Sequence, residues 1–171
     1  MNAKAQSALS LDLDSELATL ELGAVLARSA PRGARDAVVV YLQGDLGSGK
    51  TTLARALLRA LGVQGTVRSP SYTLIESYEL ADWQVLHLDL YRLREADELE
   101  HLALRDELRA GVLLLVEWPE RAERGLPEAD LRIGLTAPSE ANSHARRATL
   151  QAGTPNGRRW LVELELNGVA R

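Results

Sequence analysis

The segment from residue 38 to residue 52 constrains the fold of this chain more than any other. It reads VVVYLQGDLGSGKTT: an uncharged run rich in β-branched residues, then the pattern G-x-x-x-x-G-K-T, then a helical pattern. The apolar run predicts a buried strand, and a glycine-rich pattern between a strand and a helix is typical of a phosphate-binding loop. We therefore expect an α/β fold of the P-loop NTPase type, with three layers, a mostly parallel central sheet and an antiparallel hairpin.

This phosphate loop predicts a bound nucleoside triphosphate. Its glycines allow backbone conformations that a Cβ would forbid, so that successive N–H groups can turn towards phosphate oxygens. Lys50 is one of two lysines in the chain and can reach the β- and γ-phosphates, while the Thr51 hydroxyl can bind Mg²⁺. The positive end of the next helix favours the same anion. The predicted nucleotide-binding residues of the loop are Gly44, Asp45, Leu46, Gly47, Ser48, Gly49, Lys50, Thr51 and Thr52.

A run of five apolar residues, 112 to 116, ends at Glu117. Such a run is typical of a central parallel strand with an acid at its tip, which in P-loop enzymes supplies a second carboxylate for Mg²⁺. We expect Thr51 and Glu117 to bind Mg²⁺ with two phosphate oxygens and water, because Mg²⁺ prefers hard oxygen ligands in an octahedron. The structural alternative is that Glu117 caps the next turn. Trp118 could stack or gate beside the site, or simply pack there.

The strand-like segment 83–89 also ends in an acid, Asp89. An acid at the carboxyl edge of a sheet lies where open α/β folds bind their ligands, so Asp89 could orient water or the hydration shell of the metal. The alternatives are a helix cap or an ion pair with Arg92. His87 alternates with its apolar neighbours and, without a partner, is expected to be structural. The predicted catalytic residues are thus Lys50, Asp89 and Glu117.

The segment 67–73 is polar and contains a proline, so we expect a loop. Loops at this place in nucleotide-binding proteins often respond to the γ-phosphate, and Ser69, Ser71 and Thr73 are its candidate residues. The alternative is a plain connector. Glu16, at the start of a predicted helix, is either a first-turn acid favoured by the helix dipole or a group close to the nucleotide.

The remaining elements follow from periodicity and from turn residues. We expect helices from Ser15 to before Pro31, from Thr52 to Leu61 with Gly62 as its stop, and within 95–109; strands at 74–80 and 83–89 as a hairpin, at 131–137 and at 148–152; a loop at 139–147; and a turn at 154–157. Residues 158–166 alternate as a strand would, but they also fit a closing helix, and the pattern leaves both open.

Length and charge limit the function further. A chain of 171 residues is expected to form one domain, with residues 1–11 as a flexible tail. The net charge of −4 provides no general attraction to nucleic acid, so a contact with RNA would be local or made by a partner. The chain has no cysteine, no signal-peptide pattern and no apolar stretch as long as a membrane span. We therefore expect a cytoplasmic protein.

Four motifs taken together resemble those of the bacterial TsaE (YjeE) family. They are GDLGSGKTT at 44–52, SPSYTL at 69–74, HLDLYRL at 87–93 and VEWPER at 116–121. The likeness runs from about Glu16 to Arg147, and the combination is specific among P-loop classes. The resemblance implies a small ATPase that is required, with the TsaB–TsaD heterodimer, for making threonylcarbamoyladenosine beside the anticodon of tRNAs that read codons beginning with A. Contact with tRNA would be indirect, through the complex.

The resemblance also implies roles for individual residues. Lys50 and Thr51 match the phosphate and Mg²⁺ ligands, and Glu117 matches the Walker B acid. The other matches are Asp89 and Trp118, which the family needs for activity, Thr73 in the switch-like loop, and Glu16 at a nucleotide-contacting position. Ser71 stands where threonine is usual, which preserves the hydroxyl. The loop around Ser139 to His144 is longer than in the family, so the resemblance assigns no role to Ala145 or Arg146.

The leading hypothesis is a Mg²⁺-dependent ATPase whose turnover is slow alone, because no arginine is obviously directed at the transferred phosphate. The same loop would serve a small-molecule kinase, for which residues 92–109 are the candidate lid. A GTPase is disfavoured because the chain lacks an N-K-x-D guanine-binding motif. A third hypothesis is a nucleotide-gated binding module in which hydrolysis is incidental.

Overall fold

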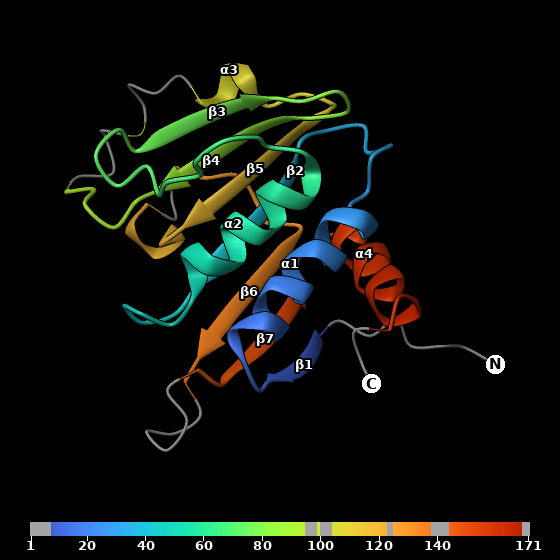
Figure 1. Ribbon diagram of the computed structural model, residues 1–171. Coiled ribbons are helices and arrows are strands. Elements are labelled where there is room, and N and C mark those ends of the chain that lie inside the picture. Colours follow the sequence, from blue (N-terminus) through green and yellow to red (C-terminus); the bar gives the residue numbers. More distant parts are fainter. Residues whose placement is uncertain (1–7, 95–98, 100–103, 123–124, 138–143, 169–171) are drawn as a thin grey trace.

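A computed structural model describes residues 8–94, 99, 104–122, 125–137 and 144–168. It is built on a seven-stranded sheet with helices against it (Figure 1). In chain order the elements are β1 (Ala8–Leu13), α1 (Glu16–Ser29), β2 (Val38–Gln43), α2 (Lys50–Leu61), β3 (Ile75–Glu79), β4 (Gln84–Asp89), α3 (Leu104–Glu107), β5 (Val112–Glu117), the 3₁₀ turn η2 (Pro119–Arg121), β6 (Leu131–Thr136), β7 (Arg146–Ala152) and α4 (Pro155–Leu166).

The strand order is β1-β7-β6-β2-β5-β4-β3, and the four strands β6, β2, β5 and β4 are parallel. Strand β3 pairs with β4 in an antiparallel hairpin, and β7 and β1 add two antiparallel strands at the other edge. The prediction of a mostly parallel α/β sheet with an antiparallel hairpin is therefore confirmed. In this arrangement the carboxyl ends of β2, β4 and β5 lie at one edge of the sheet, where each is followed by a candidate functional segment.

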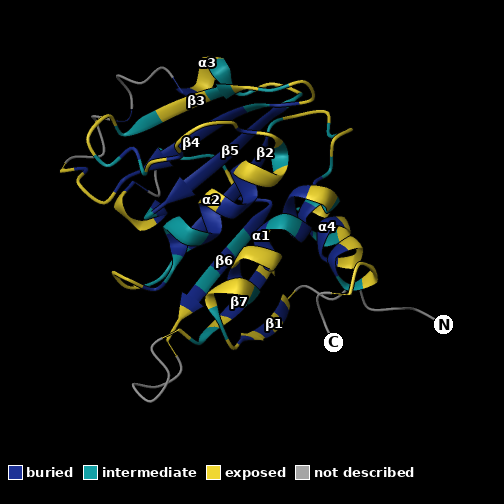
Figure 2. Ribbon diagram, in the orientation of Figure 1, coloured by how far each residue is buried: buried dark blue, intermediate teal, exposed yellow. Residues whose placement is uncertain are grey.

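Alternating residues of the central strands point to opposite faces of the sheet, and both faces are buried (Figure 2). In β2, Val38, Val40 and Leu42 belong to the core under α1, α2 and α4, whereas Val39 and Tyr41 belong to the core on the opposite face. That second face is covered by α3 and by irregular segments that include Leu90 and Leu93. Burial on both faces explains why β2 and β5 read as uninterrupted apolar runs in the sequence.

The two helices beside the phosphate loop form close to where the sequence places them. Helix α1 starts after Ser15, whose hydroxyl accepts a hydrogen bond from the Ala18 N–H at 3.2 Å. Helix α2 begins at Lys50, two residues earlier than predicted, and ends at Gly62, whose φ is 113°. Helices α1 and α2 approach closely at Gly23, where a Cβ would overlap the Ala56 Cβ. This contact sets α1 against the helix that carries the phosphate loop.

Two predictions near the ends of the chain are wrong. Residues 8–11 are not part of a tail, because they belong to β1, where Leu9, Leu11 and Leu13 are buried against β7. Residues 154–157 are not a turn: Thr154 caps α4 by accepting a hydrogen bond from the Gly157 N–H at 3.1 Å, and Pro155 occupies the first helical position. Residues 1–7 lie outside the described residues.

The question left open at 158–166 is decided in favour of the helix α4. Its buried residues Trp160, Leu161 and Leu164 have helical spacing and pack into the core beside α1. The predicted loop at 139–147 ends earlier than expected, because residues 146 and 147 already belong to β7. Of the helices expected within 95–109, α3 is observed; residues 95–98 and 100–103 lie outside the described residues. The organisation of residues 1–171 as a single domain stays a prediction.

No helix among the described residues is long and apolar enough to cross a membrane.

Candidate functional site

The phosphate loop connects the carboxyl end of β2 to the amino end of α2. Gly44 has φ 139° and Gly49 has φ 101°, values that side-chain-bearing residues rarely adopt. A Cβ on Gly44 would in addition overlap the carbonyl oxygen of Leu135 in β6. Gly44 is therefore required by both the backbone conformation of the loop and its packing against the sheet, whereas Gly49 is required by its backbone conformation.

Lys50 points back into the loop. Its side chain is only 4% exposed, and its Nζ donates hydrogen bonds to the carbonyl oxygens of Gly44 at 2.7 Å and Asp45 at 2.8 Å. The ring of Trp118 covers the ammonium group, with Nζ 3.9 Å from the ring centroid. Burial lowers the pKa of Lys50 below its ordinary value, although nearby carboxylates, Glu117 first among them, oppose the shift.

The two predicted metal ligands are in contact. Thr51 Oγ1 donates a hydrogen bond to Glu117 Oε2 at 2.7 Å, which joins the first turn of α2 to the tip of β5. The other carboxylate oxygen, Glu117 Oε1, lies 2.9 Å from His87 Nε2, and both residues are buried. Sequence reasoning treated His87 as structural unless a partner was present; its partner sits on the neighbouring strand, which a single sequence does not reveal.

Asp89 is directly opposite Glu117 in the parallel pairing of β4 and β5. Its Oδ2 accepts hydrogen bonds from the hydroxyls of Ser71, at 2.8 Å, and Ser69. Its Oδ1 accepts a hydrogen bond from the Tyr91 N–H at 3.0 Å. This local contact caps the backbone after β4 and is similar to the helix cap that the sequence offered as a structural role for Asp89. Asp89 thus ties the predicted switch-like loop to the sheet edge.

Thr73 differs from the other loop candidates. Its side chain is exposed, and it does not line the pocket described below. The adjacent Tyr72 is 84% exposed, and the Arg92 guanidinium lies over its ring, with Cζ 4.2 Å from the centroid. Arg92 therefore stacks on Tyr72, whereas the alternative considered from the sequence was an ion pair between Arg92 and Asp89.

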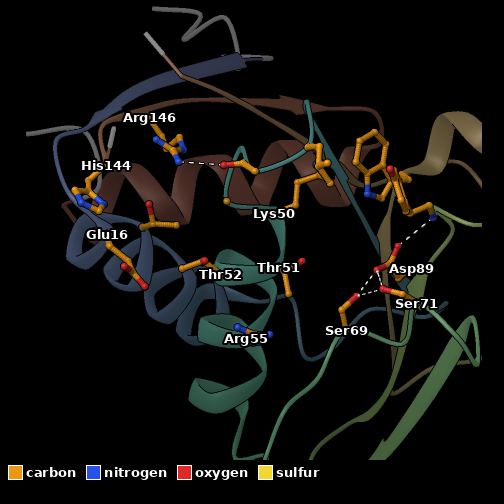
Figure 3. Close-up of a pocket in the computed structure, with 16 residues that line it drawn as sticks. Glu16, Lys50, Thr51, Thr52, Arg55, Ser69, Ser71, Asp89, His144 and Arg146 are labelled. Atoms are coloured by element: carbon orange, nitrogen blue, oxygen red, sulfur yellow. Dashed lines mark hydrogen bonds between the residues drawn. The ribbon is translucent and has the colours of Figure 1, made fainter. Parts of the chain in front are cut away.

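A pocket of about 490 Å³ lies at the carboxyl edge of the sheet, beside the phosphate loop (Figure 3). Glu16 and His144 lie at one end, Asp89 with Ser69 and Ser71 at the other, and Lys50 and Thr51 between them. The lining consists of Glu16, Thr19, Leu46, Gly47, Gly49, Lys50, Thr51, Thr52, Arg55, Ser69, Ser71, Asp89, Tyr91, Trp118, His144 and Arg146. Gly44, Asp45 and Ser48 belong to the same phosphate loop but not to this lining, and Glu117 contacts the lining residue Thr51 through a hydrogen bond.

Arg146 is a site residue that sequence reasoning missed. From the start of β7, its Nε donates to the Ser48 carbonyl oxygen at 2.8 Å and its Nη2 donates to the Gly47 carbonyl oxygen at 3.0 Å. The side chain therefore holds the phosphate loop from the opposite end of the chain. The sequence predicts a loop at 139–147 that includes Arg146, and only the pairing of β7 with β6 and β1 places this residue beside Gly47. Thr19, Arg55, Tyr91 and His144 also line the pocket without having been predicted.

The donor set fits a magnesium ion shared with phosphate. Within the described residues, no group of three acidic, histidine or cysteine side chains could enclose a metal by itself. Thr51 and Glu117 instead provide two adjacent oxygens beside the phosphate loop. Mg²⁺ is commonly bound by one or two protein oxygens together with substrate phosphates and water, rather than by a complete protein cage.

Comparison with known proteins assigns the chain to one family. The family model described as "Threonylcarbamoyl adenosine biosynthesis protein TsaE" matches residues 13–148. A Haemophilus influenzae protein named tRNA threonylcarbamoyladenosine biosynthesis protein TsaE is 48% identical over 99 residues, which cover 58% of this chain and 63% of that protein. The Bacillus subtilis protein of the same name is 38% identical over 95 residues, 56% of this chain and 59% of that protein. Each match thus spans less than two thirds of the relative.

A solved structure is similar over more of the chain. YdiB from Bacillus subtilis superposes with a TM-score of 0.71 at 27% sequence identity, and the match covers 94% of this chain and 95% of that one. This match covers a larger share of the chain than residues 13–148, which the family model matches.

Proposed function

The chain belongs to the TsaE family, and on that premise we propose that it is a Mg²⁺-dependent ATPase of tRNA threonylcarbamoyladenosine biosynthesis that works with the proteins TsaB and TsaD. The fold is that of a P-loop NTPase. The observation that carries the proposal is that Lys50 and Thr51 of the phosphate loop and α2 line one pocket, while Glu117 at the tip of the neighbouring parallel strand accepts a hydrogen bond from Thr51. These are the positions from which such proteins neutralise phosphate charge.

In the proposed complex, ATP lies along the pocket with its phosphates on the phosphate loop. Lys50 exchanges the carbonyl oxygens of Gly44 and Asp45 for oxygens of the β- and γ-phosphates, and the backbone N–H groups of the loop bind the same anion. Thr51 and Glu117 would hold Mg²⁺, which supplies charge neutralisation at the phosphates. Glu16 and His144, at the far end of the pocket, then face the nucleoside.

Two contacts support a slow reaction by the isolated chain. In this proposal Asp89 orients the attacking water, but its carboxylate is engaged by Ser69, Ser71 and the Tyr91 N–H. Arg146 bonds to carbonyl oxygens of the loop. We infer that TsaB and TsaD release Asp89, supply a charge-stabilising group, or do both. Groups supplied in trans to P-loop enzymes raise turnover by about 10³-fold or more.

The test is ATP hydrolysis by the full chain, alone and with TsaB and TsaD. We expect slow Mg²⁺-dependent release of phosphate by the chain alone and a rate at least about tenfold higher with both partners, since activation in trans commonly exceeds that. Lys50→Ala is the control, and it should be inactive in both conditions. Rapid hydrolysis by the isolated chain that TsaB and TsaD leave unchanged would contradict the proposal.

Two alternatives give different results in the same assays. Transfer of phosphate to a metabolite rather than to water would indicate a small-molecule kinase. If Glu117→Ala abolished Mg²⁺-dependent turnover but left ATP-dependent assembly and tRNA modification intact, hydrolysis would be incidental and the chain would be a nucleotide-gated binding module.

A further inference from the structure

His87 is a polar residue in the middle of an apolar strand. It is 0% exposed, and the residues before and after it in β4, Leu86 and Leu88, are 2% and 0% exposed. Its Nδ1 is buried and has no hydrogen-bond partner among the described residues, whereas its Nε2 lies 2.9 Å from Glu117 Oε1. A buried polar atom without a partner costs free energy, so an apolar side chain would serve the core better. Packing alone therefore does not explain this histidine.

The contact with Glu117 specifies which nitrogen carries the ring proton. An ionised carboxylate only accepts hydrogen bonds, so His87 Nε2 is the donor to Glu117 Oε1. Hydrogen bonds to a charged acceptor are shorter and stronger than those between neutral groups. The imidazole thus gives Glu117 a directional partner inside the sheet, where no water is needed to satisfy that oxygen.

Glu117 is consequently held through both of its oxygens. His87 on β4 binds Oε1, and Thr51 on α2 binds Oε2. Asp89 is directly opposite Glu117 in the strand pairing, and neighbouring carboxylates repel one another. Two donors from two separate elements keep Oε2 directed towards Thr51 despite this neighbour.

We propose that His87 is a positioning residue for magnesium: it orients Glu117 so that Oε2 and the Thr51 hydroxyl form the protein side of the Mg²⁺ site. The inference rests on the proposed function, because it assumes that Glu117 binds Mg²⁺ when ATP is present. His87 should therefore contribute to the part of the ATP affinity that depends on Mg²⁺, and not to the part that the phosphate loop provides alone. Outer-shell partners of metal ligands are commonly worth about 10- to 100-fold in metal affinity.

The experiment measures the affinity of the full chain for ATP by calorimetry, once in EDTA and once in saturating Mg²⁺. In His87→Gln the amide nitrogen reaches the place of Nε2 and keeps the donor. In His87→Asn the amide reaches only the place of Nδ1, and His87→Leu has no donor. Trp83→Phe, immediately before β4, is the matched control for a change in the core, since the Trp83 indole nitrogen is likewise buried without a partner in the described part of the chain. Thermal unfolding shows which variants are folded.

We expect His87→Asn and His87→Leu to reduce the ratio of the two affinities by about tenfold or more, with the affinity in EDTA within about threefold of wild type. His87→Gln and Trp83→Phe should retain the wild-type ratio. If His87→Leu fails to fold, the comparison of Gln with Asn decides. An unchanged ratio in folded Asn and Leu variants, or an equal loss in His87→Gln, would overturn the inference alone. If the ATP affinity of the wild-type chain were the same in EDTA and in Mg²⁺, the proposed function would be overturned as well.

Discussion

Among the single residues of the pocket, Lys50 holds a charge where burial disfavours it. Burial lowers its pKa, while Glu117, Glu120, Asp89 and Asp45 favour the charged form. The pKa of Lys50 is lower in the folded chain than in the unfolded chain. Burying the charged ammonium therefore lowers the free energy of unfolding by its full amount at pH values below the folded pKa, and this cost disappears as the pH rises towards the unfolded pKa. The interaction between the Lys50 ammonium and phosphate has the opposite pH dependence: it is present at low pH and is lost as the pH rises, because it needs the protonated amine.

ATP affinity should therefore fall as the pH rises into the alkaline range, and the decline should begin below the pH at which an ordinary lysine loses its proton. The measurement is the dissociation constant for ATP in EDTA as a function of pH, which removes any contribution from the metal. Lys50→Met should bind ATP weakly and show no such decline. An identical pH dependence in wild type and Lys50→Met would assign the titration to another group.

Arg146 provides a second prediction, because its neighbour is a natural control. Arg146→Ala removes the donors that bind the Gly47 and Ser48 carbonyl oxygens, so the loop should lose its conformation and ATP affinity should fall by about tenfold, the equivalent of one or two such bonds. Arg147→Ala breaks only an exposed ion pair with Asp12 at 2.8 Å, which is worth little. Calorimetry with ATP compares the two, and equal affinities would contradict a role for Arg146 in holding the loop.

Pairs of elements determine how accurately the pocket is assembled. Helix α1 carries Glu16 and Thr19 to the pocket, and its distance from α2 depends on Gly23. A Cβ at this position would overlap the Ala56 Cβ and lie 2.9 Å from the Leu57 nitrogen. The backbone of α2 cannot yield without moving the phosphate loop, so packing between the two helices is coupled to the site.

Gly23→Ala should consequently lower the free energy of unfolding by about 1–3 kcal/mol, although alanine is intrinsically the better helix former. It should also weaken ATP binding. Urea denaturation measures the first effect and calorimetry the second. Gly33→Ala is the control: a Cβ there meets no atom within 4 Å, and its effect should stay within about 0.5 kcal/mol. A stable Gly23→Ala protein would mean that α1 can shift without cost.

On the scale of the whole molecule, the sheet brings distant parts of the chain to one edge. Glu16 and Arg146, 130 positions apart in the sequence, line the same pocket as Lys50 and Asp89. A change at the phosphates can therefore affect both the loop at 69–73 and the amino end of β7. Leu46, which lines the pocket, is 75% exposed, and Tyr72, the neighbour of the lining residue Ser71, is 84% exposed.

We accordingly expect the nucleotide state to control association with TsaB and TsaD. Recovery of the complex should differ between ATP, ADP and no nucleotide when the full chain is used to capture the two partners. Lys50→Ala should behave as the nucleotide-free protein in all three conditions. Equal recovery of TsaB and TsaD in every condition would remove the nucleotide-switch hypothesis.

Local sequence was sufficient wherever the determining contacts are themselves local. The phosphate loop depends on glycines within six residues of one another, β5 on a continuous apolar run, and the amino end of α1 on Ser15. Prediction failed at residues 8–11, because β1 is defined by its pairing with β7. At 158–166 the alternating pattern left strand and helix open, and the cap of the helix, Thr154, is itself bonded to Asp130 from a distant segment.

By itself, then, the sequence determined that this chain has a P-loop at the end of a buried strand, with acids at the tips of two others, because strand burial and loop conformation are encoded by neighbouring residues. Only the tertiary structure decided what those acids touch. The parallel register places Glu117 beside Asp89 and within reach of His87, and the pairing of β7 places Arg146 on the loop. Such contacts join residues far apart in sequence, and their geometry is fixed by the packing of the sheet.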